Sequence, residues 1–268
     1  MEINSLELWR ELVNDNLRNA NGNHNQRYMR HARQKQLRPD PLLDFVLKEV
    51  DSQTTVLDIG AGTGRWSIPL AGRAGSVTAI EPDGDMVEVL QENLKTAGVD
   101  IRIVQSTWED ADVKAHDIVV CAHAMYSSTD FALFVRKMEQ CAGKTCYLAI
   151  RLPPVNGIIG ELCRAVWGRQ HDSVNAVVAY NALYSLGIYP NLLMENEIYR
   201  WTSNTLEEAF TRAKRHLHLE SNAAYDELIR NTLRERLTPT ENGYIWPDGM
   251  RSALLWWNPS AIAKSVET

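Results

Sequence analysis

The sequence predicts an α/β protein built on a mostly parallel sheet with helices on both faces. Between residues 54 and 151, short apolar runs of strand length alternate with amphipathic helical stretches. A glycine-rich turn, residues 60–64, directly follows the first of these runs and opens the next helix. Such alternation is typical of parallel strands, because each parallel pair needs a crossover connection, usually a helix.

Each element of this alternation has its own signal. Strands are predicted at 54–59, 76–81, 101–105, 117–122 and 145–151. Helices are predicted between them, near 64–73, 83–97 and 129–142. The last of these helices repeats apolar residues on one face: Phe131, Phe134, Met138 and Cys141.

The residues before this region predict two helices and a basic segment. Residues 4–20 carry apolar residues at helical spacing after a capping box formed by Asn4 and Glu7. A second amphipathic stretch follows Pro41. The basic segment 24–38 lies between them and contains no acidic residue; its cations are Arg27, Arg30, Arg33, Lys35 and Arg38.

The rhythm changes after residue 151. Two helical stretches run to about residue 186, a strand-like run follows at 191–201, helices are predicted near 204–219 and 222–236, and a final strand lies within 251–259. We therefore expect N-terminal helices that form a lid (1–50), a core (51–151), a helical cap insertion that contributes a late strand (152–240), and a C-terminal segment that completes the core (241–268).

Composition limits the class of partner. With 268 residues, 44% of them hydrophobic, the chain can bury a full core, and its net charge of -6 disfavours nucleic acid as a partner. The four cysteines form no CxxC pair, and His216 and His218 are too close in a predicted helix to share a face, so no metal site is expected. Without a signal-peptide pattern or a membrane-length apolar run, we expect a soluble cytoplasmic protein with a small-molecule partner.

The glycine-rich turn indicates a nucleotide-like cofactor. Its pattern is D-x-G-x-G-x-G, from Asp58 to Gly64, and Glu81 ends the next predicted strand 21 positions after Gly60. Glycines let the backbone approach a ligand closely, and an acid at this distance suits a ribose hydroxyl. A nicotinamide fingerprint would have a third glycine where Arg65 stands, which disfavours a nicotinamide-dependent oxidoreductase.

The stretch "LDIGAGTG" resembles the first motif of class I S-adenosylmethionine (SAM)-dependent methyltransferases, and the resemblance extends over roughly residues 50–151. It implies a Rossmann-like sheet and SAM as the cofactor. The final "ALLWWNP" is weakly similar to the family's antiparallel C-terminal strand.

The resemblance also implies cofactor contacts. Asp58 would bond the amino group of the methionine moiety, and Glu81 would hold the ribose hydroxyls. The other implied cofactor-binding residues are Gly60, Ala61, Gly62, Gly64, Pro82, Met86 and the adenine-side residues Thr107, Trp108 and Glu109, with Tyr28 or Arg33 near the cofactor carboxylate.

Three residues are candidates for catalysis. His123 follows the fourth predicted strand and could act as a general base, or it could only shape the pocket. Tyr126 could orient the substrate or pack, and Arg151 could grip an anionic group or pair with an acid of the cap. Four cap aromatics could line a substrate pocket or lie in the core: Trp167, Tyr180, Tyr184 and Tyr189.

The predicted function is methyl transfer from SAM to a small molecule, with the O, N, S or C nucleophile left open. Enzymes that methylate the exocyclic amines of nucleobases resemble one another in an Asn/Asp-Pro-Pro-aromatic signature after the fourth strand. Here that site reads "AHAMY", which disfavours this class of enzyme. The alternatives are a protein or RNA methyltransferase that docks through the basic segment 24–38, and a SAM-binding protein without catalysis. The oligomeric state is left open.

Overall fold

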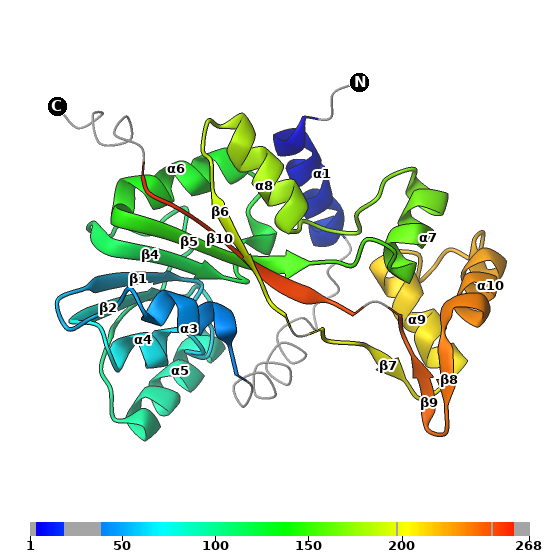
Figure 1. Cartoon of the computed structure of the whole chain (residues 1–268), viewed down its shortest axis with the longest axis horizontal. Coiled ribbons are helices and arrows are strands. Elements are labelled where there is room, and N and C mark those ends of the chain that lie inside the picture. Colours follow the sequence, from blue (N-terminus) through cyan, green and yellow to red (C-terminus); the bar gives the residue numbers. More distant parts are fainter. Residues whose placement is uncertain (1–3, 19–38, 197, 248, 260–268) are drawn as a thin grey trace.

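The computed structural model describes residues 4–18, 39–196, 198–247 and 249–259. A seven-stranded sheet in the order β3-β2-β1-β4-β5-β10-β6 forms its centre (Figure 1). Its strands are β1 (Thr55–Ile59), β2 (Ser76–Ile80), β3 (Arg102–Val104), β4 (His116–Ala122), β5 (Ala142–Leu152), β6 (Asn191–Met194) and β10 (Arg251–Trp257). The first five are parallel, and β10 runs antiparallel to both β5 and β6. The mostly parallel sheet and its antiparallel C-terminal strand are thus confirmed.

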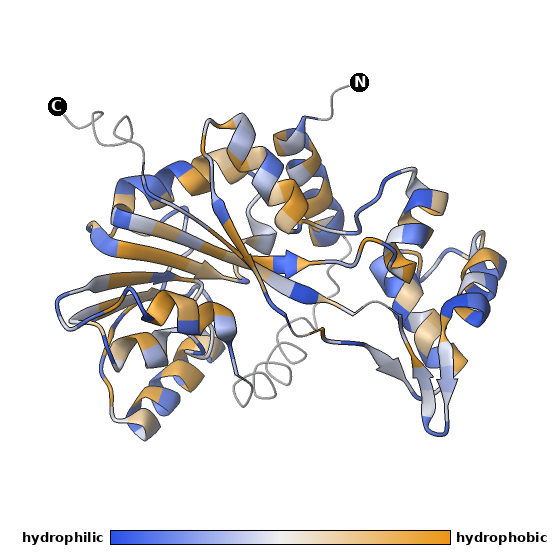
Figure 2. Cartoon of the chain, viewed as in Figure 1, coloured by the Kyte–Doolittle hydropathy of each residue, from blue (hydrophilic) through white to orange (hydrophobic). Residues whose placement is uncertain are grey.

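Helices cover both faces of this sheet. One face carries α1 (Ser5–Arg18), α6 (Phe131–Cys141) and α8 (Ala176–Ser185), and the other carries α3 (Pro41–Leu47), α4 (Ser67–Ala71) and α5 (Gly84–Ala97). Trp9 of α1 stacks on Phe131 of α6 with ring centroids 4.0 Å apart. Figure 2 shows hydrophobic residues gathered along the central strands, as expected for a parallel sheet buried on both faces.

The remaining elements form a small lobe beyond one edge of the main sheet (Figure 1). It contains α7 (Ile158–Trp167), α9 (Leu206–His216), α10 (Asp226–Arg236) and an antiparallel sheet in the order β7-β9-β8. The strands of this sheet are β7 (Thr202–Ser203), β8 (Thr238–Thr240) and β9 (Gly243–Ile245). The small lobe has a hydrophobic cluster of its own, which includes Leu162, Phe210 and Leu233.

The elements differ from the sequence expectations in three places. The strand-like run predicted at 191–201 is a strand only over Asn191–Met194. The helix predicted near 64–73 is only Ser67–Ala71, because residues 60–66 are used by the glycine turn. Strands β7, β8 and β9 were not predicted, since they are two or three residues long and β8 contains Pro239. Within the described residues, no helix is long and apolar enough to cross a membrane.

Candidate functional site

The glycine-rich turn joins the end of β1 to α4. Its three glycines have positive φ: Gly60 at 69°, Gly62 at 56° and Gly64 at 92°. The N–H groups of Gly60 and Ala61 both donate to the carbonyl of Ile80, at 2.8 and 3.0 Å, so the turn is fixed against the end of β2. A Cβ on Gly60 would lie 2.2 Å from the Cβ of Ala124 in the loop after β4. Bare backbone therefore lies at the switch point of the sheet, where open α/β sheets bind ligands.

Glu81, directly after β2, closes the other side of the turn. Its Oε2 accepts a hydrogen bond from the N–H of Gly62 at 2.7 Å, and its Oε1 accepts one from the N–H of Asp83 at 3.0 Å. Burial raises the pKa of Glu81 above its ordinary value, although the two backbone donors oppose the shift. A carboxylate has about four acceptor sites, so both oxygens keep capacity for a ligand's hydroxyl groups.

Asp58 is the second acid of this cradle and is almost fully buried at the end of β1. Its Oδ2 accepts a hydrogen bond from the Ser67 hydroxyl at 2.6 Å. Burial raises the pKa of Asp58 to about 6, and the nearby charge of Glu81 adds to the shift. In the part of the chain that the structure describes, neither carboxylate forms an ion pair, so the cradle is complementary to a ligand with positive charge.

The other predicted cofactor residues differ in their burial and in their hydrogen bonds. Met86 is buried in the first turn of α5, whereas Pro82, which precedes this helix, is exposed. Trp108 packs inside the core and donates from its indole N–H to the carbonyl of Phe134, at 3.2 Å. The hydroxyl of exposed Thr107 donates to Asp110, and exposed Glu109 accepts from Ser128. Tyr28 lies outside the described residues, and the roles of all these side chains stay predictions.

His123 and Tyr126 occupy the loop between β4 and α6. His123 has a φ of 59°, and its backbone N–H donates to the carbonyl of Ala149 at 2.9 Å, which fixes the start of the loop. Its Nδ1 lies 3.0 Å from the Tyr126 hydroxyl. That hydroxyl oxygen also accepts from the backbone N–H of Arg151, at 3.1 Å. The structure therefore brings the three predicted catalytic residues together at the ends of β4 and β5.

The side chain of Arg151 is already engaged by the chain. Its Nη2 lies 3.2 Å from Oδ1 of Asp172, and its Nε donates to the carbonyl of Val174. The other oxygen of Asp172 lies 3.1 Å from Nδ1 of His216. Burial opposes ionisation of Asp172, but Arg151 and His216 more than offset it and hold its pKa well below the usual range. Of the two roles considered for Arg151, pairing with an acid from 152–240 is the one that the structure contains.

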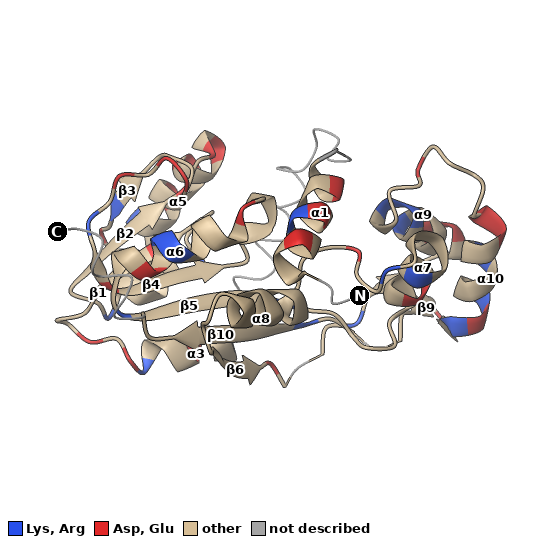
Figure 3. Ribbon diagram, turned by 90° about the horizontal axis from the view of Figure 1, so that it is seen from above, with Lys and Arg blue, Asp and Glu red and all other residues tan. Residues whose placement is uncertain are grey.

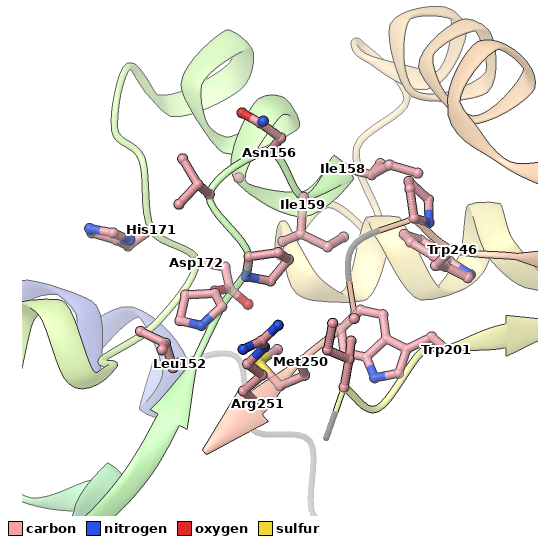
Figure 4. A pocket seen from close by; sticks show the side chains of 18 of the residues that line it. Leu152, Asn156, Ile158, Ile159, His171, Asp172, Trp201, Trp246, Met250 and Arg251 are labelled. Atoms are coloured by element: carbon pink, nitrogen blue, oxygen red, sulfur yellow. The ribbon is translucent and has the colours of Figure 1, made fainter. Parts of the chain in front are cut away.

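A cavity of about 500 Å³ lies where the small lobe meets the sheet. Leu152 ends β5, Arg251 begins β10 and Met194 ends β6, and all three line the cavity. Since β10 is antiparallel, these positions all lie at the carboxyl edge of the parallel strands, the edge that also carries the cradle. Figure 4 shows apolar side chains on most sides, with His171, Asp172 and Arg251 among them.

The aromatic side chains of the cavity are Trp201 and Trp246, which the sequence did not single out. They lie 45 positions apart and meet because β7 pairs with β9, with Thr202 opposite Ile245. The four aromatics predicted to line a substrate pocket or lie in the core are Trp167, Tyr180, Tyr184 and Tyr189. All four are exposed and outside the lining of this cavity, although Tyr189 lines a second, smaller pocket near Trp257. No sequence pattern could have found the tryptophan pair, because its proximity depends on a long-range strand pairing.

Comparison with known proteins agrees with this geometry. Residues 56–143 match a family model described as a methyltransferase domain. The chain is 38% identical over 71 residues to a ubiquinone biosynthesis O-methyltransferase from Rickettsia conorii, covering 26% of this chain and 25% of that protein. It is 36% identical over 90 residues to a probable ribosomal RNA small subunit methyltransferase A from Methanosphaera stadtmanae, covering 32% and 33%. The chain thus spans about a quarter to a third of the length of these relatives.

A solved structure shares the fold over more of the chain. The YcgJ protein from Bacillus subtilis aligns with a TM-score of 0.56 at 18% identity, and the alignment covers 81% of this chain and 97% of that one. The sheet order, the glycine cradle and the family match together define a methyltransferase domain. Residues 56–143 are thus a methyltransferase domain, and the glycine motif that they contain implies SAM as its cofactor.

The residues of the cradle fit this cofactor. SAM carries a sulfonium, an ammonium group and two ribose hydroxyls, whereas the cradle offers two buried acids that form no ion pair within the described chain. This arrangement is compatible with the roles predicted for Asp58, on the ammonium group, and Glu81, on the hydroxyls, and both roles stay predictions. The positive-φ glycines leave the backbone bare beside them.

Proposed function

We propose that this protein transfers a methyl group from SAM to a small-molecule acceptor. The observation that carries the proposal is the order of three parts along one edge of the sheet. The cradle lies at β1 and β2, His123 and Tyr126 follow β4, and the cavity lies beyond β5 and β10. In the order of the strands, the candidate proton-transfer residues thus stand between the cofactor cradle and a cavity of small-molecule size.

In this proposal the protein aligns the reactants. SAM supplies a methyl group that is already activated by the positive charge on sulfur. Asp58 and Glu81 hold the two ends of the cofactor, and the close contact between Gly60 and Ala124 fixes the loop after β4 against the cradle. Alignment of this kind is a large part of the rate enhancement in a displacement between two bound reactants.

His123 is proposed to accept the proton of an acceptor that carries one. The contact of its Nδ1 with the Tyr126 hydroxyl orients the imidazole, and Tyr126 is itself oriented by the backbone N–H of Arg151. A positioned base of this type contributes about 10²-fold to 10⁴-fold in rate. His123→Ala is therefore expected to lower the turnover rate while leaving the affinity for SAM unchanged.

Calorimetric titration with SAM tests the cofactor half of the proposal. Glu81→Ala removes the carboxylate that faces the ribose, so we expect SAM affinity to fall about 100-fold. Glu88→Ala, an exposed acid of α5, is the matched control and should leave SAM affinity unchanged.

Formation of S-adenosylhomocysteine with a panel of small-molecule acceptors tests the catalytic half. Turnover that depends on His123 would support the proposal. Tight SAM binding without turnover on any acceptor class would instead indicate a SAM-binding protein without catalysis. Absence of SAM binding in the wild-type chain would contradict the proposal as a whole.

An RNA acceptor is the second candidate, favoured by the match to a ribosomal RNA methyltransferase. The basic segment 24–38, which would dock the RNA, lies outside the described residues. In the small lobe, basic and acidic residues are interleaved (Figure 3), and ion pairs such as Arg230 with Glu207 and Lys214 with Asp226 neutralise part of its positive charge. RNA retention that is lost when the arginines of 24–38 are replaced by glutamine would favour this candidate.

A further inference from the structure

The lining of the cavity has an asymmetry of charge. Two of its lining residues are charged, Asp172 and Arg251, and the apolar walls include Ile158, Ile159 and Met250. These two side chains come from different parts of the chain and do not form an ion pair with each other. Their charges are therefore compensated separately, and the compensation differs between them.

Asp172 is neutralised by neighbours. Arg151 and His216 contact its two oxygens at 3.2 and 3.1 Å, so its acceptor capacity is directed away from a ligand. An ion pair between a buried carboxylate and a guanidinium has little net charge to repel an anion placed in the cavity. Asp172 therefore lines the cavity without presenting a net charge to a ligand.

Arg251 has no such partner among the described residues. Its guanidinium makes one long hydrogen bond, 3.5 Å from Nη1 to the carbonyl oxygen of Glu195. The Glu195 carboxylate does not pair with it and instead accepts from the backbone N–H of Ser252, at 2.7 Å. Figure 4 shows the Arg251 side chain among the lining residues, next to Met250 and near Asp172. A guanidinium has five donors, so most of the capacity of Arg251 is available to a ligand.

The aromatic part of the wall is rigid. Trp201 stacks on His216 with ring centroids 4.9 Å apart and meets Trp246 edge to face at 5.6 Å. Strand β10 holds Arg251 opposite Leu152 of β5, so the cation is fixed at the end of the sheet. A preformed apolar wall with one fixed cation is suited to a ligand that has an apolar body and an anionic end.

We propose that the cavity is the acceptor site and that Arg251 selects an apolar acceptor bearing one anionic group, a carboxylate or a phosphate. This inference rests on the proposed function and deepens it. The anion-binding role that the sequence suggested for Arg151 passes to Arg251, because Arg151 is occupied by Asp172. The apolar body lies against Ile159 and Trp201, and the anionic group accepts hydrogen bonds from the Arg251 guanidinium.

The test compares ligands that share one apolar body. Naphthalene-2-carboxylate, 2-naphthyl phosphate and the neutral naphthalene-2-carboxamide are titrated by calorimetry into the full chain. We expect one of the two anions to bind at least about tenfold more tightly than the carboxamide, since a charge-assisted bond to a guanidinium exceeds a neutral one. Which anion binds more tightly distinguishes a carboxylate acceptor from a phosphate acceptor.

Variants assign the preference to Arg251. Arg251→Gln should abolish the preference for the anion and leave carboxamide binding within about twofold, whereas Arg251→Lys should retain part of it. The matched control is Arg234→Gln, which removes an exposed cation of α10 that does not line the cavity. A preference that survives in Arg251→Gln, equal affinity for anion and carboxamide, or no binding of any probe overturns the inference.

SAM titration of the same proteins separates the two proposals. SAM should bind Arg251→Gln as tightly as it binds the wild type, because the cradle is at β1 and β2. Normal SAM binding without anion preference would overturn the acceptor inference alone. Failure of the wild type to bind SAM would overturn the proposed function.

Discussion

Gly60 combines a left-handed backbone with a contact that leaves no room for a side chain. Its φ is 69°, and a Cβ would lie 2.2 Å from the Cβ of Ala124. Gly98 at the end of α5 has nearly the same φ, 68°, but open space around it. Gly98→Ala should therefore cost only the conformational strain, about 1 kcal/mol, whereas Gly60→Ala should cost about 3 kcal/mol because overpacking is added. Urea unfolding of the two variants measures the difference.

A second substitution isolates the contact. Gly60→Ala combined with Ala124→Gly removes one of the two colliding methyl groups. The double variant should then recover most of the difference between Gly60→Ala and Gly98→Ala, measured in the same unfolding experiment. If the double variant is as unstable as the sum of its single changes, the loop after β4 is not held against the turn by this contact.

The buried carboxylate of Asp58 lowers the stability of the fold but is predicted to bind SAM. Its pKa is about 6 in the folded protein against an ordinary value of 3.8, so the folded state binds the proton more tightly than the unfolded state does. The free energy of unfolding therefore falls as pH rises from about 4 to about 6 through this group. Asp58→Asn should be more stable than the wild type at pH 7, by about 2 kcal/mol, and should bind SAM much more weakly.

Thermal unfolding at pH 5 and pH 7 checks this prediction. The stabilising effect of Asp58→Asn should be larger at pH 7, where the wild-type carboxylate is ionised, than at pH 5. A stabilisation that does not change between these two pH values would show that the buried charge is not its source.

At the scale of elements, the pair Arg151–Asp172 ties the end of β5 to the segment before α8. Both side chains are largely buried, with exposed fractions of 22% and 12%. Removing one partner leaves a buried charge, so Asp172→Asn should destabilise the protein by about 3 kcal/mol. Arg151→Met combined with Asp172→Leu should cost less than Asp172→Asn does, because no charge is left unpaired.

The pH dependence of this pair has the opposite sign to that of Asp58. The pKa of Asp172 lies well below its usual range in the folded state, so its contribution is fully present above the unfolded value of about 3.9. The destabilisation of Asp172→Asn should therefore be present at pH 5 and should diminish below about pH 4. Chemical unfolding across this range measures it.

The elements of residues 54–151 could be predicted because their signals are local. Strand length, apolar runs and the cap of α5, where Asp83 accepts from the Met86 N–H at 3.1 Å, all lie within a few residues of one another. The small sheet β7-β9-β8 could not be predicted. Its strands are too short for an alternating pattern to be seen. β8 and β9 pair as a local hairpin, but β7 pairs with β9 over more than 40 positions, with Thr202 opposite Ile245.

At the scale of the whole molecule, two hydrophobic clusters stabilise separate parts. Leu57 lies in the cluster under the sheet, and Leu233 lies in the cluster of the small lobe. Leu233→Ala should open the small lobe and weaken ligand binding in the cavity, while SAM binding is retained. Leu57→Ala leaves a similar void, which costs about 2 to 5 kcal/mol of stability. This variant should weaken both ligand binding in the cavity and SAM binding. Hydrogen exchange and the two titrations measure the outcomes.

The cofactor cradle and the cavity differ in how far the sequence could predict them. The cofactor side depends on one turn and one acid 21 positions away, so a motif describes it. The cavity depends on Leu152, Trp201, Trp246 and Arg251, which meet only after the sheet and the small lobe have formed. No local spacing links these residues, and long-range packing alone brings them together.

The position of β10 also governs the order in which the protein can be completed during synthesis. β10 follows both β5 and β6 in the chain but lies between them in the sheet, so these two strands emerge from the ribosome earlier. Until Arg251–Trp257 is available, both strands present unpaired edges, which are prone to pairing with other chains. The nascent chain can assemble the cofactor half first, but the chamber lined by Arg251 can close only when translation reaches the final strand.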